Sequence, residues 1–155
     1  MKTKHSIKTI TLTLAALVGT SPALAHHYKI DGIYKMHVQI SDRLFVDLVT
    51  LKEESNHQLS GTVTVPGNFT APLKGHYGGD SESFSINSSN QIEFTIEAIE
   101  RGNKIRVLYQ GEIDPRSGND GIFFKGVAYD LDDPALPFGT IDAGPLKVVP
   151  IKNHF

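Results

Sequence analysis

The stretch YQGEI, at residues 109–113, is the most informative about the fold, because its glycine is in phase with the apolar residues of an alternating run. Three other stretches share the pattern: LSGTV at 59–63, LKGHY at 73–77 and FKGVA at 124–128. Glycine weakens the interior of a strand, where it often marks a bend or a close approach of backbones. The four glycines therefore predict strands that bend on one shared face.

The runs around these glycines alternate apolar and polar residues with a period of two. Ile105, Val107, Tyr109, Gly111 and Ile113, for example, alternate with Arg106 and Gln110. Such alternation is typical of strands with one buried and one exposed face. We predict strands at 33–40, 43–51, 58–65, 69–77, 82–86, 91–99, 104–113, 121–129 and 145–151.

One of these segments also fits a helix. Ile92, Ile96 and Ile99 would form a helical stripe, from which Phe94 would point away. Isoleucine, phenylalanine and threonine favour strands, so we predict a strand at 91–99.

The strand pattern predicts an all-β fold, a single antiparallel up-and-down β-barrel of about eight strands. Closing a small barrel makes its strands tilt and bend, and inward glycines relieve the crowding where the bend is sharpest. The same glycines would also leave room for a ligand. The alternative is a β-sandwich, in which each glycine marks a bulge or a tight contact between sheets.

The N-terminal segment 1–25 has the composition of a secretory signal peptide. A basic head with three lysines precedes a short apolar run, and the segment ends in Ala23-Leu24-Ala25. Cleavage there would leave 26–155 as one barrel domain in the periplasm or outside a bacterial cell. Losing Lys2, Lys4 and Lys8, with no acid lost, would change the formal net charge from −2 to −5.

Charge and cysteine content limit the classes of partner. A mildly acidic protein has no electrostatic reason to bind nucleic acid or an anionic membrane surface. The chain has no cysteine, so burial rather than disulfides must stabilise the domain.

The segment Asp31-Gly32-Ile33-Tyr34, followed by an antiparallel meander and by Leu59-Ser60-Gly61-Thr62, resembles the calycin group, which includes lipocalins and avidin-like proteins. In those families the aromatic residue is usually a tryptophan that plugs one end of the barrel. Here it is Tyr34, and the chain has no tryptophan. The resemblance implies a small barrel that holds an apolar or amphipathic ligand in its mouth.

The predicted ligand-binding residues are those of the inward face. They comprise large apolar side chains and the four glycines: Tyr34, Met36, Val38, Gly61, Val63, Gly75, Phe94, Tyr109, Gly111, Phe124 and Gly126.

We predict no catalytic residue, no metal site and no cofactor. His26-His27 could hold Cu(II) or Ni(II) at a new terminus, but a terminal pair that binds nothing is the expected case. Asp130, Asp132 and Asp133 lack the calcium-loop pattern.

Two further patterns give no catalytic site either. The Gly79-Asp80-Ser81 triplet lacks the α/β context of an esterase. Glu93 and Glu97 would lie on the solvent face about 13 Å apart. Nothing selects a reaction, so we expect a binding protein more than an enzyme.

Three functions remain open. The first is an exported barrel that binds a small apolar or amphipathic molecule. The second is a protein-interaction module, such as an inhibitor of an exported hydrolase, with contacts in loops 114–120 and 130–139. There Ala135-Leu136-Pro137-Phe138 would be a docking patch if exposed, or, as we expect, a plug over one barrel end. The third is an eight-stranded outer-membrane barrel, against which Pro150 and the absence of aromatic girdles argue.

Overall fold

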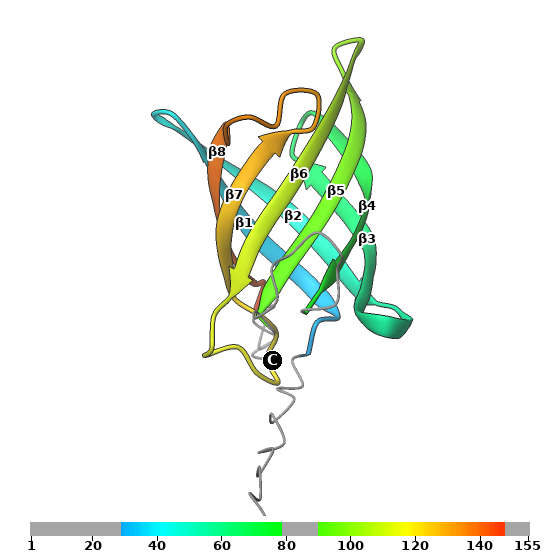
Figure 1. Ribbon diagram of the computed structural model, residues 1–155, viewed down its shortest axis with the longest axis vertical. Coiled ribbons are helices and arrows are strands. Elements are labelled where there is room, and N and C mark those ends of the chain that lie inside the picture. The colour runs from blue at the N-terminus through cyan, green and yellow to red at the C-terminus, as the bar shows by residue number, and fades with distance from the viewer. Residues whose placement is uncertain (1–28, 79–89, 148–155) are drawn as a thin grey trace, which may run out of the picture.

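Eight antiparallel strands pair in sequence order, and the last pairs with the first to close a barrel (Figure 1). The computed structural model describes residues 29–78 and 90–147. The strands are β1 (Gly32–Ile40), β2 (Arg43–Glu53), β3 (Gln58–Val65), β4 (Phe69–Tyr77), β5 (Gln91–Glu100), β6 (Asn103–Ile113), β7 (Phe124–Asp130) and β8 (Gly139–Pro145). The predicted up-and-down barrel is confirmed, and the sandwich alternative is wrong. Segment 91–100 is a strand, as predicted, and not a helix.

The apolar face of every strand points inward. The buried core draws on all eight strands and has one charged member, Asp47. Polar and charged residues occupy most of the outward positions, as in β5 and β6, whereas the outward positions Leu44, Val46 and Leu48 of β2 are apolar. A membrane-spanning barrel is apolar outside and polar inside, so this arrangement does not support the outer-membrane alternative. Within the described ranges, no helix is long and apolar enough to span a bilayer.

The four in-phase glycines let neighbouring strands approach closely. A Cβ atom on Gly61, Gly75 or Gly126 would lie within 2.0 Å of a carbonyl oxygen of the next strand, and on Gly111 it would lie 2.8 Å from one. Gly111 and Gly126 also face each other directly across β6 and β7. The prediction that these glycines serve barrel closure is therefore supported. The prediction that they leave room for a ligand is wrong, because backbone occupies that space.

The barrel has two ends, which we call upper and lower as in Figure 1. The upper end carries the turns at 41–42, 66–68 and 101–102 and the loop 131–138. The lower end carries the single-turn 3₁₀ helix Ser55–His57, the loop 114–123 and the segment that enters β1.

The last strand is not where the sequence predicted it. We predicted 145–151, but β8 is Gly139–Pro145, so Pro145 ends the strand instead of beginning it. Only Ile141 and Ala143 of this segment have strong apolar inward side chains, and two glycines weaken its strand pattern. β7 begins at Phe124, three residues later than predicted. The predicted strand at 82–86 and residues 148–151 lie outside the described residues.

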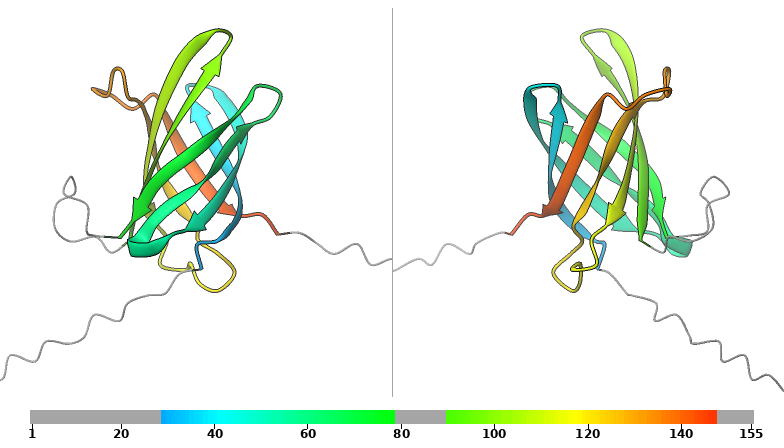
Figure 2. Two further views of the ribbon diagram at one scale, coloured as in Figure 1. Left: turned by 90° about the vertical axis from the view of Figure 1, so that its right-hand side faces the viewer. Right: turned by 60° about the vertical axis from the view of Figure 1, so that its left-hand side comes forward.

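The loop 131–138 does not plug the barrel. Leu136 is 78% exposed and Phe138 is 37% exposed. Figure 2 shows the loop projecting sideways from the upper end instead of crossing it. The expectation of a plug is wrong, and the apolar residues of this loop face solvent.

Candidate functional site

The predicted ligand-binding residues all lie on the inward face of the barrel. The seven with side chains are buried, with exposed fractions no higher than 4%: Tyr34, Met36, Val38, Val63, Phe94, Tyr109 and Phe124. The glycines Gly61, Gly75, Gly111 and Gly126 lie on the same inward face and bring neighbouring backbones together. Their role in binding stays a prediction.

Four of the predicted residues form an aromatic cluster in the middle and lower parts of the interior. The ring centroids of Phe94 and Tyr109 are 4.9 Å apart, those of Phe94 and Phe124 are 6.1 Å apart, and those of Tyr34 and Phe124 are 6.4 Å apart. Rings at these separations pack against each other. In this part of the barrel the aromatic side chains therefore fill the interior.

The lower end is sealed by backbone groups that hydrogen-bond to Tyr34. Its hydroxyl donates to the Ile30 carbonyl over 2.6 Å, and the Ile122 amide donates to the same hydroxyl over 3.4 Å. Ile30, Ile113 and Ile122 are buried beneath it. Burial raises the pKa of Tyr34, so the hydroxyl keeps the proton that it donates. This tyrosine occupies the plug position that the resemblance to calycins implied.

Among the described residues, no hydrogen-bonded aromatic side chain covers the upper end as Tyr34 covers the lower end. The inward apolar residues nearest to it keep solvent exposure, from half-buried to the 41% of Phe45. They are Ile40, Phe45, Val65, Phe69, Ala98 and Ile105. Of these, Ile40, Phe69 and Ala98 pack against the buried core below them.

Asp47 lies just below this rim. It occupies an inward position of β2, opposite Met36 of β1, and is 4% exposed. Its Oδ1 atom is buried and has no hydrogen-bond partner. Burial raises the pKa of the carboxyl group to about 6. A buried charge without a partner is costly, so such a group needs an explanation.

Tyr109 is the polar side chain that the structure links to Asp47. Burial raises the pKa of Tyr109, and the charge of Asp47 raises it further. Both side chains are buried and take inward positions, on β2 and β6. The upper half thus combines apolar walls with a carboxyl and a phenol.

The sequence analysis did not identify Asp47, although the sequence contains a signal for it. In FVDLV, at residues 45–49, the aspartate takes the inward phase of Val49 and Leu51. Because acids are rarely buried, an aspartate at a predicted core position is a signal of a functional site.

The charged inward positions of the upper end are mostly acidic. Glu100 and Asp130 share the inward phase at the ends of β5 and β7, and Arg43 shares it at the start of β2. Within the described strands, no inward position carries lysine or histidine. Glu100 accepts a hydrogen bond from Asn68, and Asp130 accepts one from the Asp132 amide over 2.9 Å. Asp47 is therefore the buried acid of this end that lacks such a partner.

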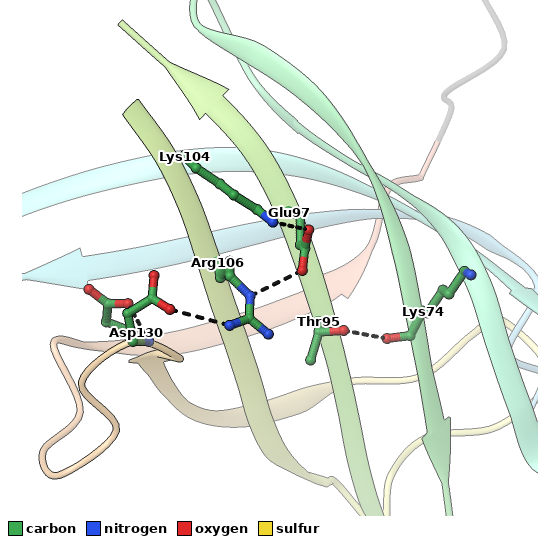
Figure 3. A network of polar contacts seen from close by, with 7 residues as sticks. Lys74, Thr95, Glu97, Lys104, Arg106 and Asp130 are labelled. Carbon is green, nitrogen blue, oxygen red and sulfur yellow. Dashed lines mark hydrogen bonds and ion pairs between the residues drawn. The ribbon is translucent and has the colours of Figure 1, made fainter. Parts of the chain in front are cut away.

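The other acids singled out from the sequence have structural partners on the outer surface. Arg106 bridges Glu97 at 3.0 Å and Asp132 at 3.2 Å, and Lys104 contacts Glu97 at 2.9 Å (Figure 3). Glu93 accepts a hydrogen bond from Gln110 over 2.8 Å. Among the described residues, no group of three or more ligating side chains could hold a metal ion. His26-His27 and Gly79-Asp80-Ser81 lie outside the described residues.

The outer surface also carries an apolar stripe on β2. Leu44, Val46 and Leu48 are between 38% and 60% exposed and occupy successive outward positions. Beside it lies a hollow of about 450 Å³, which Leu44 borders together with Gln39 and Thr140. This surface is separate from the barrel interior.

Comparisons with models of known families, with curated proteins and with solved structures found no match. The eight-stranded up-and-down topology is consistent with the calycin-like resemblance. The structure therefore shows a small closed β-barrel.

Proposed function

We propose that this barrel binds a small apolar or amphipathic molecule through its upper end. One observation carries the proposal: inward-facing apolar residues are exposed to solvent at the upper end, whereas Tyr34 and three isoleucines seal the lower end. An eight-stranded barrel is just wide enough to be filled by side chains or to hold one small ligand.

The distribution of large and small inward side chains supports entry of a ligand through the upper end. Three of the largest fully buried side chains, Tyr34, Phe94 and Phe124, lie in the middle and lower parts of the interior. Alanines face inward in the upper half: Ala71, Ala98 and Ala128. A bound molecule would contact the rim and stop above the aromatic cluster. Pockets of this kind are mostly apolar with a few polar groups.

The test is a titration with 1-octanol followed by amide chemical shifts. Binding as proposed will shift the amides of Phe45, Phe69 and Ala98 in a saturable way and leave those of Ile113 and Ile122 unchanged. Phe45→Ser should weaken the interaction, whereas Leu48→Ser, on the outer face of the same strand, should not. Shifts that fail to saturate, or that cluster at Leu48, would reject the proposal.

A second candidate function is protein docking on the outer surface. Its support is the exposed apolar stripe of β2 and Leu136 in the loop 131–138. Monomeric proteins rarely expose contiguous apolar patches, and larger ones mark interaction sites. A partner that docks there would lose affinity with Val46→Asp and keep it with Phe45→Ser.

We also propose export to the periplasm or the medium. The support is the composition of residues 1–25. N-terminal sequencing of the protein from fractionated bacterial cells tests this: a mature chain that starts at His26 supports export, and a cytoplasmic chain that retains Lys2 refutes it.

A further inference from the structure

The strongest unexplained feature of the interior is the Asp47 carboxyl group. It is 4% exposed, its Oδ1 atom has no partner, and apolar side chains surround its strand position. Leaving a buried acceptor unsatisfied costs about 1–3 kcal/mol, and more when the group is charged. The protein gains nothing for its own stability from this aspartate.

We propose that the ligand of this barrel is an amphipathic amine, whose protonated nitrogen pairs with Asp47 while its apolar part contacts the rim of the upper end. This inference rests on the proposed binding function and specifies its ligand class. An ammonium group offers both a donor and a positive charge, which are the two things that the carboxylate lacks.

Neutral and anionic ligands fit the site less well. An alcohol could donate one hydrogen bond but would leave the negative charge uncompensated. A carboxylate ligand would meet Asp47 and, at the rim, Glu100, with Arg43 as the basic residue of the inward phase. Like charges in one confined region repel. The acidic upper end therefore selects against anions.

A bare metal ion fits less well still. Calcium and magnesium need several oxygen ligands, and the described residues contain no group of three or more that could supply them. A cation that carries its own apolar body needs only one carboxylate, because the barrel walls contact the rest of the molecule.

The groups around Asp47 set the pH dependence of binding. Met36 faces it from β1, Tyr109 interacts with it electrostatically from β6, and Arg43 lies four residues before it on β2. The pKa of Asp47 is about 6, whereas burial keeps Tyr109 protonated to high pH. Amine affinity should be full above about pH 7 and fall as the carboxylate becomes protonated near pH 6 and below.

The experiment compares octylamine, 1-octanol and octanoate, which share one alkyl chain, by calorimetry on the purified full chain at about pH 7.5. We expect octylamine to bind at least about tenfold more tightly than octanol, and octanoate to bind most weakly. Asp47→Asn should bring octylamine to the affinity of octanol. Asp142→Asn makes the same chemical change at an exposed outward position of β8, where the carboxyl contacts Lys125 at 3.4 Å; it is the matched control and should change octylamine affinity by less than about twofold.

The outcomes separate this inference from the proposed function. Equal binding of octylamine and octanol, unchanged by Asp47→Asn, would overturn the amine inference and leave the binding function intact. Saturable binding of none of the three would overturn both. A pH titration adds a check: octylamine affinity should fall between about pH 7 and 5 while octanol affinity stays constant. Parallel pH profiles for the two would also reject the inference.

Discussion

The two ends of this barrel use the same alternating strands and differ in what closes them. At the lower end, the Tyr34 hydroxyl bonds to two backbone groups and covers a layer of buried isoleucines. At the upper end, Phe45 and its inward neighbours remain exposed, and the buried polar group, Asp47, has an oxygen without a partner. This difference is the basis of the proposal that binding occurs at the upper end, because natural proteins give up stability at functional sites.

The largest expected effect comes from truncating one phenylalanine at each end. Phe124→Ala removes a fully buried ring that contacts Tyr34 and Phe94, so it should destabilise the fold by about 3–5 kcal/mol. Phe45→Ala removes a ring that is 41% exposed, so the loss should stay below about 1 kcal/mol. Urea denaturation measures both. Equal losses would mean that the upper end is packed as tightly as the lower.

The second largest effect is a gain in stability, from the replacement of Asp47. The pKa of Asp47 is raised to about 6 from its ordinary value of 3.8, so the folded state disfavours the charged form. The cost is absent below about pH 4, develops as pH rises towards 6, and is fully present above that. Asp47→Asn should therefore stabilise the protein by about 2 kcal/mol at pH 7.

The same variant supplies its own control. At about pH 4 the aspartate is almost fully protonated in the folded chain and close to half protonated in the unfolded chain, so most of the stability gain of Asp47→Asn should disappear. The measurement is the free energy of unfolding in urea at both pH values. A gain that is equal at pH 4 and pH 7 would show that charge burial is not its cause.

The sequence predicted the strands correctly where the alternation of apolar and polar residues alone determines the structure. The period-two runs gave seven of the eight strands, and glycines at 61, 75, 111 and 126 indicated closure, because tight closure brings their backbones against a neighbouring strand. The segment Gly139–Pro145 failed because its small side chains carry little strand preference of their own. Pairing with both β1 and β7 holds it in place.

Alternation along the sequence did not predict how the two barrel ends differ in closure. Alternation shows that Asp47 faces inward, but only the register shows that it lies opposite Met36, with no donor within reach of Oδ1. Likewise, the sequence shows a tyrosine at position 34 but not that Ile30 and Ile122 converge on its hydroxyl. These partners lie 4 and 88 residues away, so their meeting depends on the closed barrel.

A third test removes the seal of the lower end without changing its packing. Tyr34→Phe keeps the buried ring and deletes the hydroxyl, which leaves the Ile30 carbonyl and the Ile122 amide without this partner. We expect a loss of about 1–2 kcal/mol. Hydrogen exchange of the Ile122 amide should accelerate while amides in β3 stay protected. Unchanged exchange at Ile122 would show that the loop 114–123 holds its place without the tyrosine.

The smallest effect should come from the ion pairs beside the upper end. Arg106 joins Glu97 on β5 to Asp132 in the loop 131–138, and all three side chains are well exposed (Figure 3). Exposed ion pairs contribute little to global stability because solvent and salt screen them. Arg106→Gln should leave the urea midpoint unchanged, but it should make the loop more sensitive to limited proteolysis, and high salt should reproduce this effect in the unaltered protein. A clear drop in the urea midpoint would instead show that the upper end shares in the global stability of the barrel, which would weaken the contrast between the two ends.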